Sequence, residues 1–256
     1  MRVYQAIILG IVQGLTEFLP ISSSGHQIIA GRLLGIDHVP LGFELLTHIA
    51  TLLAVCIAMR KTLWALLKKP KQKMNLLVIV ATVPTVIIFF VLRTFFESAF
   101  DGRWLAVCFA ATAVLLFVSG MIKTKNSDKK LGFLDAAIIG IAQGAAGMPG
   151  ISRSGATIAT AKLLGQSQEN AASFSFLISI PIIIGATIWQ FVGGGFSFGI
   201  AVLPAIAGFI ASFIVGFFSI TFMLRLVKKM SLNGFSIYLI GLALILTLLQ
   251  SRALFM

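Results

Sequence analysis

The sequence has 256 residues, of which 58% are hydrophobic and only 11% are charged, whereas a typical soluble domain has roughly 45–50% apolar and about 25% charged residues. Since a water-soluble globule of this length cannot enclose so many apolar side chains, the composition excludes soluble enzymes, disordered proteins and disulfide scaffolds, and it predicts an integral membrane protein. We interpret the net charge of +12 as basic loops beside anionic lipid, not as a nucleic-acid-binding surface.

The first predicted element is a short apolar stretch that leads into a polar break within residues 10–35. Gln13 and Glu17 lie four residues apart and therefore share one face of a helix, which Pro20 ends. Three hydroxyls and an imidazole follow, from Ser22, Ser23, Ser24 and His26. Neither arm is long enough to cross a bilayer, so we expect a re-entrant helical hairpin with its tip buried in protein or facing a wet cavity.

Three apolar stretches follow that are long enough to span the hydrocarbon as helices, at residues 41–58, 76–92 and 105–122. The loops after the first and the third stretch, at 60–73 and 123–130, are rich in lysine and arginine. The loop between the second and third stretches is poorer in basic charge. Because lysine and arginine concentrate in cytoplasmic loops, we place the two basic loops in the cytoplasm.

A second polar break, within residues 140–165, repeats the first. The two segments align without a gap at an offset of 130 residues and are identical at 12 of 26 positions, which indicates an internal duplication. In the second break Arg153 is flanked by hydroxyls on a glycine-containing turn that opens a helix. Backbone N–H groups, a helix N-terminus and a guanidinium together are typical of an oxyanion or phosphate site.

Glycines recur at a spacing of four in the first arm of each hairpin, at Gly10 and Gly14 and at Gly140 and Gly144. Such pairs of small residues allow close approach of membrane helices. The sequence therefore predicts tight helix packing at both arms.

Three further spans follow the second break, at residues 171–192, 200–224 and 235–249. A third basic loop, with Arg225, Lys228 and Lys229, follows the second of these spans, and the same rule places it in the cytoplasm. Because three is an odd number, the second half must be inverted relative to the first, as in many transporters. We predict an all-α polytopic membrane protein with six transmembrane helices plus two re-entrant hairpins whose tips meet. The chain is then a single domain over 1–256, built from two inverted repeats at about 1–125 and 131–256.

Three ionisable side chains carry the strongest functional signal, because a charge at membrane depth costs roughly 2.5–3.5 kcal/mol even on a lenient insertion scale. Glu17, His26 and Arg153 all lie at the duplicated breaks. Glu44 and His48 form another pair four residues apart, and Glu44 either supports the site or lies at headgroup level. This inventory suits phosphoryl chemistry on a lipid, with Glu17 available to hold a divalent cation.

The paired motifs resemble those of the undecaprenyl-diphosphate phosphatases, the bacterial bacitracin-resistance phosphatases. One signature, an acidic-or-Gln-xxx-Glu stretch with a Pro-x-Ser-Ser-x-Gly-His loop, appears here from Gln13 to His26. The other, Pro-Gly-x-Ser-Arg-Ser-x-x-Thr, appears from Pro149 to Thr157. The resemblance covers essentially the whole chain. It departs at His48, where the family usually has Gln, and Gln13 leaves one fewer carboxylate for metal.

The resemblance implies hydrolysis of undecaprenyl diphosphate to the monophosphate carrier lipid of peptidoglycan synthesis, and bacitracin resistance. It implies a divalent cation, Mg²⁺ or Ca²⁺, and a multi-pass protein of the bacterial cytoplasmic membrane whose site opens to the extracytoplasmic side. Carried over residue by residue, the family's functional positions fall on Gln13, Glu17, Ser22, Ser23, His26, Ser152, Arg153, Ser154 and Thr157.

We accordingly predict that Arg153 and backbone amides of the second tip bind the diphosphate, and that Glu17 with Gln13 binds the cation. Ser23 attacks phosphorus or positions the attacking water, and His26 acts as general base and then acid. Glu44 would support the site. The predicted substrate-binding residues are Ser22, Ser24, Gly150, Ser152, Ser154 and Thr157, of which Ser22 and Ser24 also stay open as nucleophiles.

Architecture alone favours a different class of protein, a polyprenyl-phosphate flippase or a secondary transporter, because inverted repeats with broken helices are common there. Phosphate release by the purified protein separates the two classes. The sequence leaves the oligomeric state open, a homodimer included.

Overall fold

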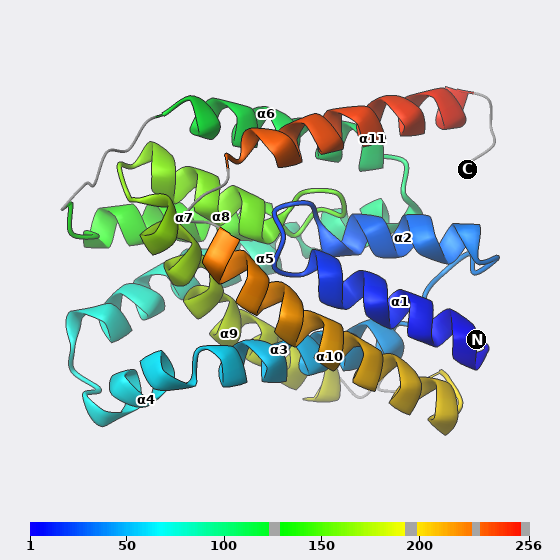
Figure 1. Ribbon diagram of the computed structural model, residues 1–256, viewed down its shortest axis with the longest axis horizontal. Coiled ribbons are helices and arrows are strands. Elements are labelled where there is room, and N and C mark those ends of the chain that lie inside the picture. Colours follow the sequence, from blue (N-terminus) through cyan, green and yellow to red (C-terminus); the bar gives the residue numbers. More distant parts are fainter. Residues whose placement is uncertain (123–128, 193–198, 227–230, 252–256) are drawn as a thin grey trace.

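The computed structural model describes residues 1–122, 129–192, 199–226 and 231–251, and all regular secondary structure in these ranges is helical. Most of the helices run roughly along the long axis of the molecule (Figure 1). The first half contains α1 (Val3–Thr16), α2 (Ser23–Leu33), α3 (Leu41–Ala58), α4 (Arg60–Lys68), α5 (Lys73–Ser98), a 3-10 turn (Ala99–Asp101) and α6 (Leu105–Met121). The second half contains α7 (Phe133–Ala145), α8 (Arg153–Leu163), α9 (Gln168–Val192), α10 (Val202–Leu226) and α11 (Asn233–Ser251).

Among the described residues, five helices are long and apolar enough to cross a membrane, namely α3, α5, α9, α10 and α11. The remaining predicted span corresponds to α6, which is shorter at 17 residues. Helix α3 has the predicted bounds, whereas α5 extends beyond the predicted 76–92 at both ends. Its extension includes Arg93 and Glu97, which lower the hydropathy but form an ion pair of 2.6 Å one helical turn apart.

The predicted basic loop at residues 60–73 contains a helix, α4, that the sequence interpretation missed. Its residues are mostly good helix formers, but their positive charge indicates only the side of the membrane and not the backbone conformation. Trp64 is 62% exposed and Leu67 is 73% exposed, and the Lys68 ammonium lies 5.4 Å from the Trp64 ring centroid. Exposed basic and aromatic side chains on a short helix are typical of a membrane interface.

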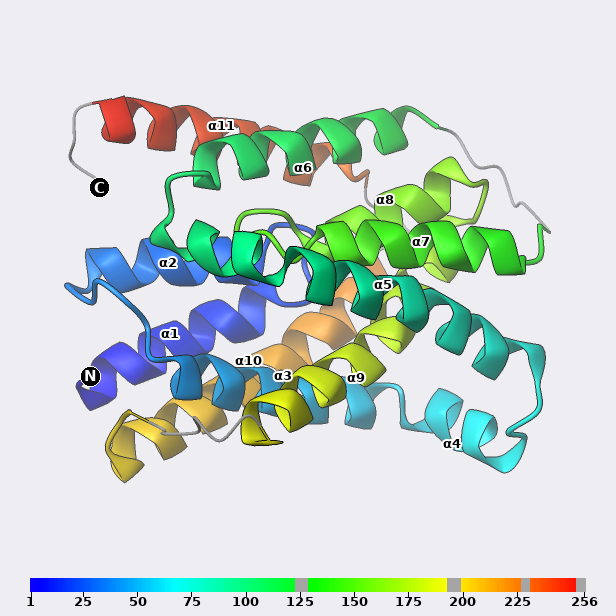
Figure 2. The same cartoon turned by 180° about the vertical axis from the view of Figure 1, so that it is seen from behind.

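Helices α1 and α2 form one hairpin, α7 and α8 form a second, and the two enter the molecule from opposite ends of its long axis (Figure 1). Helix α1 packs along α10, and α7 packs along α5, as Figure 2 shows for the second pair. At the 130-residue offset of the repeat, the residues of α1 align with those of α7, and the residues of α5 align with those of α10. Each hairpin therefore packs on a helix of the other half, in equivalent pairs.

The predicted glycine pairs lie at these two crossings. A Cβ atom on Gly10 would lie 2.4 Å from a carbonyl oxygen of α10, and one on Gly140 would lie 2.1 Å from a carbonyl oxygen of α5. Gly14 and Gly144 have neighbours at 2.7 and 2.8 Å in the same test. No side chain larger than hydrogen fits at these distances, so the prediction of close helix packing at both arms is confirmed.

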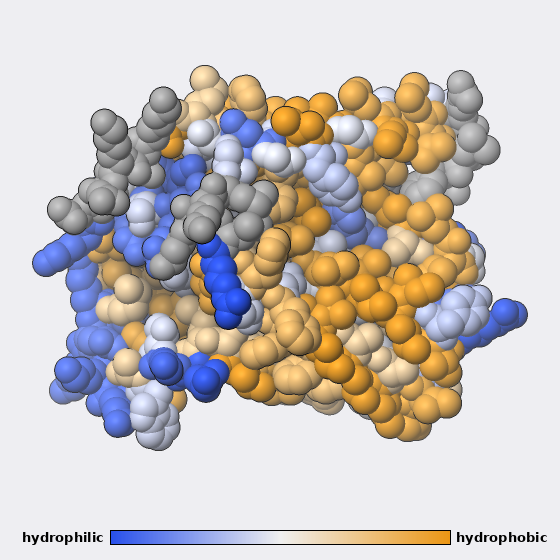
Figure 3. Space-filling view, in the orientation of Figure 1, coloured by the Kyte–Doolittle hydropathy of each residue, from blue (hydrophilic) through white to orange (hydrophobic). Residues whose placement is uncertain are grey.

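The surface between the two ends of the molecule is apolar. Val91, Val192 and Val202 are 75%, 78% and 74% exposed, and hydrophobic side chains cover most of the face in Figure 3, while hydrophilic ones gather at the end that carries α4. This pattern is that of a multi-pass membrane protein with one basic end. The basic positions predicted within 123–128 and 227–230 lie outside the described residues.

Candidate active site

The tips of the two hairpins are in contact near the middle of the molecule, as the sequence predicted. The Gly150 N–H donates to the Ser22 hydroxyl oxygen at 3.2 Å, and the Ser154 hydroxyl donates to the Leu19 carbonyl oxygen at 2.8 Å. These bonds join residues about half a chain apart, so the site is built by both halves.

Each tip ends in a serine that caps the following helix. The Ser22 Oγ accepts from the Gly25 N–H at 3.4 Å at the start of α2, and the Ser152 Oγ accepts from the Gly155 N–H at 3.0 Å at the start of α8. Ser22 also has a φ of +70°, a left-handed backbone conformation that is uncommon outside glycine and is often found at functional turns. These two buried hydroxyls therefore fix the local backbone.

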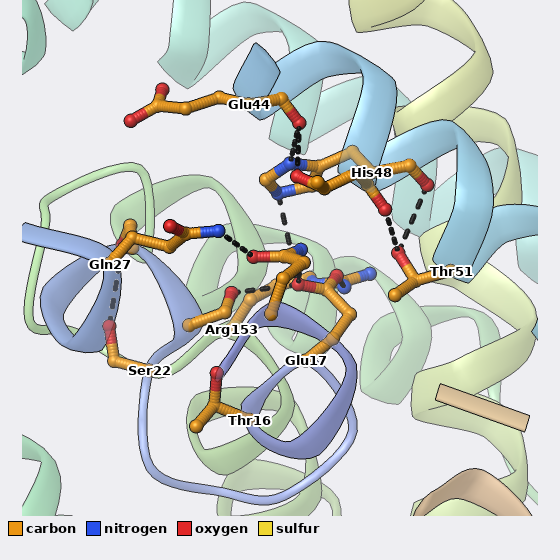
Figure 4. Close-up of polar contacts among 12 residues, drawn as sticks. Thr16, Glu17, Ser22, Gln27, Glu44, His48, Thr51 and Arg153 are labelled. Atoms are coloured by element: carbon orange, nitrogen blue, oxygen red, sulfur yellow. Dashed lines mark hydrogen bonds and ion pairs between the residues drawn. The ribbon is translucent and has the colours of Figure 1, made fainter. Parts of the chain in front are cut away.

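The Glu17 carboxylate is the centre of the polar cluster (Figure 4). Its Oε2 accepts from the Gln13 amide at 2.9 Å and from the Ser23 hydroxyl at 2.7 Å, and it lies 3.7 Å from the His48 Nε2. Its Oε1 is paired with the Arg153 guanidinium. The Glu17 side chain is only 2% exposed, and a carboxylate so buried requires paired partners. Both halves of the chain supply these partners, Gln13 and Ser23 from the first half and Arg153 from the second.

The Arg153 guanidinium has an unused hydrogen-bond donor among the described residues. Its Nη2 contacts Glu17, while its Nη1 is buried and has no hydrogen-bond partner in the described part of the chain. A buried N–H without a partner is energetically costly, so it is a ready donor to an anion. Because Arg153 is also the first residue of α8, its backbone lies at the positive end of that helix.

The other predicted hydroxyls have mainly structural contacts. The Ser24 Oγ lies 3.4 Å from the Ser22 Oγ, and the Ser152 Oγ lies 3.2 Å from the Ser154 Oγ. The Thr157 Oγ1 lies 2.6 Å from the Ser175 Oγ. The structure thus brings four predicted residues into one cluster, Gln13, Glu17, Ser23 and Arg153, and it uses six to build the tips, Ser22, Ser24, Gly150, Ser152, Ser154 and Thr157.

His26 contacts α11 and α6. Its Nδ1 lies 2.7 Å from the Ser22 carbonyl oxygen and therefore carries the proton, because a carbonyl only accepts. Its Nε2 lies 2.8 Å from the Tyr238 hydroxyl, and its ring stacks on Tyr238 and meets Phe109 edge-on. Sequence reasoning missed Tyr238; its only signal was that it is one of two tyrosines in the chain.

Two more side chains complete the cluster. The Gln27 amide donates to the Gln13 Oε1 at 3.3 Å, and the His48 Nδ1 lies 2.8 Å from the Glu44 carbonyl oxygen. Figure 4 shows the Glu44 carboxylate pointing away from Glu17, so Glu44 contributes through its backbone. Gln27 was not identified from the sequence, and His48 was identified only as a partner of Glu44 and as a departure from the family.

The donor set around Glu17 fits a hard divalent cation. Within the described residues no three His, Cys, Asp or Glu side chains gather into a metal site. Mg²⁺ in phosphoryl-transfer sites, however, is usually held by one or two carboxylates together with water and substrate phosphates. Glu17 supplies the carboxylate, Ser23 a hydroxyl oxygen, and Gln13 an amide oxygen once its amide turns, since the two amide ends are nearly alike in shape.

Similarity to known proteins extends over nearly the whole chain. The family model described as "Bacitracin resistance protein BacA" matches residues 6–245. The undecaprenyl-diphosphatase of Carboxydothermus hydrogenoformans is 41% identical over 261 residues, which cover 100% of both chains. Those of Treponema denticola and Rubrobacter xylanophilus are 40% and 39% identical, and each match covers 95% of this chain and 96% of the relative.

Proposed function

The chain belongs to the bacitracin resistance protein BacA family, and we propose that the Glu17 cluster is the active site with which it hydrolyses undecaprenyl diphosphate. The protein is a membrane phosphatase that releases the terminal phosphate and leaves undecaprenyl phosphate. One observation carries the assignment of the site. The Arg153 Nη2 contacts Glu17 and its Nη1 has no partner among the described residues, and the Ser23 hydroxyl donates to the same carboxylate.

The diphosphate binds at Arg153. A guanidinium presents a planar fork that matches two phosphate oxygens at once, and the free Nη1 is one arm of that fork. The N-terminus of α8, which begins at Arg153, adds a partial positive charge. Both features come from the second hairpin, so this hairpin holds the substrate.

Ser23 of the first hairpin is the nucleophile. As its Oγ bonds to the terminal phosphorus, its proton passes to the Glu17 Oε2, which lies 2.7 Å away. The bond from that phosphorus to the bridging oxygen breaks, and undecaprenyl phosphate leaves with the electron pair. In this step Glu17, and not His26 as the sequence suggested, is the proton acceptor, because the Ser23 hydroxyl already donates to the Glu17 carboxylate.

Water completes the cycle. It attacks the phosphorus of phosphoserine and gives a proton to the His26 Nε2, which gives up its hydrogen bond from the Tyr238 hydroxyl. His26 then releases this proton to solvent. The bond between phosphorus and the Ser23 Oγ breaks, Glu17 returns the proton to that oxygen, and inorganic phosphate leaves. A cation held by Glu17, Ser23 and Gln13 would neutralise charge on the diphosphate. Glu44 supports the site by holding His48.

The membrane arrangement is part of the proposal. The two hairpins are re-entrant and belong to inverted repeats at about 1–125 and 131–256, with α6 as the sixth span. Support comes from their approach from opposite ends and from the equivalent crossings of α1 on α10 and α7 on α5. The basic end faces the cytoplasm by the positive-inside rule, in the bacterial cytoplasmic membrane. The site then opens to the other side, from which the first hairpin enters.

Phosphate release by the purified full chain in detergent tests the function. We expect release from polyprenyl diphosphates of short and long chain, none from the monophosphates, and loss of activity with EDTA or in Arg153→Ala. A flippase or secondary transporter releases no phosphate under any of these conditions.

A further inference from the structure

His48 presents a ring nitrogen to Glu17 with its lone pair exposed. Its Nδ1 lies 2.8 Å from the Glu44 carbonyl oxygen, and since a carbonyl only accepts, Nδ1 carries the proton and the Nε2 of the neutral ring is an acceptor. That Nε2 lies 3.7 Å from the Glu17 Oε2. Two acceptors that face each other repel unless a positive charge lies between the two atoms.

The spacing of the surrounding atoms favours a cation. The Ser23 hydroxyl, the Gln13 amide and the His48 Nε2 lie 2.7, 2.9 and 3.7 Å from the Glu17 Oε2. Adjacent ligands of an ion with bonds of about 2.1 Å are roughly 3.0–3.5 Å apart in octahedral or tetrahedral coordination. The observed distances lie just below and just above this range, so they are compatible with Glu17 and these three groups as ligands of one ion.

Gln27 provides a second, independent observation. Its Oε1 is buried and has no hydrogen-bond partner among the described residues, while its Nε2 donates to the Gln13 Oε1 at 3.3 Å and to the Leu9 carbonyl oxygen at 3.4 Å. If both amides turn, the Gln13 oxygen faces the cation and the Gln13 nitrogen donates to the Gln27 oxygen. The unsatisfied oxygen of Gln27 is thus the partner that Gln13 needs when it binds a cation.

The second ring nitrogen of His48 is held as in many metal-binding histidines. In those residues the ring N–H that does not face the metal commonly donates to a backbone carbonyl, as the His48 Nδ1 donates to the Glu44 carbonyl oxygen. The His48 side chain is 35% exposed, so an ion can reach it. The equivalent residue in the second repeat is Ile178, which is fully buried. Only the first half of the chain offers this nitrogen.

We infer that His48 is a nitrogen ligand of the divalent cation at Glu17, which makes the site a mixed nitrogen and oxygen site. The inference rests on the proposed function, which places a cation there. Imidazole favours transition metals, whereas Ca²⁺ prefers oxygen. His48 therefore strengthens the binding of Mn²⁺ and leaves that of Ca²⁺ nearly unchanged.

Electron paramagnetic resonance of Mn²⁺ bound to the full chain in detergent, without substrate, tests this inference. We expect echo modulation from a directly bound nitrogen in the unsubstituted protein, with a frequency that changes after labelling with ¹⁵N-histidine. His48→Gln removes the modulation and weakens Mn²⁺ binding by about tenfold, with Ca²⁺ binding within twofold. Two matched controls keep the modulation, His38→Gln at an exposed turn and His26→Asn at the first tip.

The outcomes separate the inference from the function. Bound Mn²⁺ without nitrogen modulation, in a protein that releases phosphate, overturns the inference and leaves the function intact. A protein that releases no phosphate overturns the function whatever its spectrum. The labelled, unsubstituted protein decides the question alone if His48→Gln does not fold.

Discussion

Arg153 of the second tip and Glu17 of the first form an ion pair between residues 136 positions apart in the sequence. Their side chains are 19% and 2% exposed, and charges so deep in a membrane protein are tolerated when they are paired. In the mechanism proposed above, a diphosphate that binds Arg153 competes with Glu17 for the same guanidinium. Under that proposal substrate binding frees the carboxylate from the guanidinium, so one contact both joins the tips and couples binding to chemistry.

Ser22 and Ser23 are adjacent, but alanine substitution should lower stability at Ser22 and activity at Ser23. Ser23→Ala should lower kcat by about 10³-fold or more, because it removes the nucleophile, with little change in thermal stability. Ser22→Ala should keep most of kcat but lose about 1 kcal/mol of stability with the helix cap. Measuring kcat and Tm for both checks this prediction, and an active Ser23→Ala enzyme would move the nucleophile to another hydroxyl or to water.

His26 and Tyr238 should be coupled. His26→Ala should lower kcat by at least about 10²-fold, a typical contribution of a general base. Tyr238→Phe keeps the stacked ring and loses only one hydrogen bond, worth roughly 1 kcal/mol, so kcat should fall by about fivefold. Tyr4→Phe is the matched control, because Tyr4 is 50% exposed on α1. An unchanged kcat in Tyr238→Phe would show that His26 does not depend on this hydroxyl.

Gly140 and Gly241 should respond oppositely to alanine. A Cβ atom on Gly140 would lie 2.1 Å from the Ala81 carbonyl oxygen, whereas one on Gly241 meets nothing within 4 Å. Gly140→Ala should therefore cost about 1–3 kcal/mol through overpacking. Gly241→Ala should be neutral or stabilising by up to about 1 kcal/mol, through helix propensity. Thermal unfolding in detergent compares them, and equal Tm values would contradict close packing of α7 on α5.

The sequence predicted the fold where hydropathy and repetition decide it. Helix α3 begins and ends where expected, at Leu41 and Ala58, because its apolar run has clear limits. Hydropathy did not predict the helices correctly in two places, where the helix and the apolar run have different limits. In α5 the ion pair of Arg93 with Glu97 continues the helix beyond the apolar run, and in α4 a charged segment is itself helical.

The sequence predicted only those site residues that belong to local sequence motifs. Glu17, Ser23 and Arg153 stood out because charged or clustered polar residues at a duplicated break are unusual. Their partners in space could not be read from the sequence, because a helix from another part of the chain can bring any of its residues to the site. Tyr238 lies 212 residues from His26, and no periodicity links them.

The inverted arrangement can be tested by labelling single cysteines at Asp37 and Gln168. Asp37 lies in the connection between α2 and α3, and Gln168 begins α9, so equivalent connections carry the two labels. On a background without Cys56 and Cys108, a membrane-impermeant thiol reagent should reach Asp37→Cys from outside and Gln168→Cys only from the cytoplasm. Labelling of both from the same side would contradict the inverted repeats.

Arg153→Lys is the sharpest test of the site. Lysine keeps the charge and pairs with Glu17, so the protein should insert and fold, but a single ammonium cannot match two phosphate oxygens as a planar fork does. By analogy with the removal of one oxyanion donor, we expect a loss of about 3–4 kcal/mol of transition-state stabilisation, or roughly 10²–10³ in kcat. Arg153→Ala should be worse, because Glu17 is then left buried without its main partner.

The alternative is that Arg153 only holds the tips together by pairing with Glu17. Lysine should then substitute with little loss of activity, and the double variant Glu17→Gln with Arg153→Gln should be as stable as the unsubstituted protein, because two buried charges are replaced by two amides. The catalytic role predicts instead that this double variant is folded but inactive. Measuring kcat and Tm for the Lys, Ala and double variants side by side separates the two, and a stable, fully active Arg153→Lys enzyme would refute the role of Arg153 in binding the diphosphate.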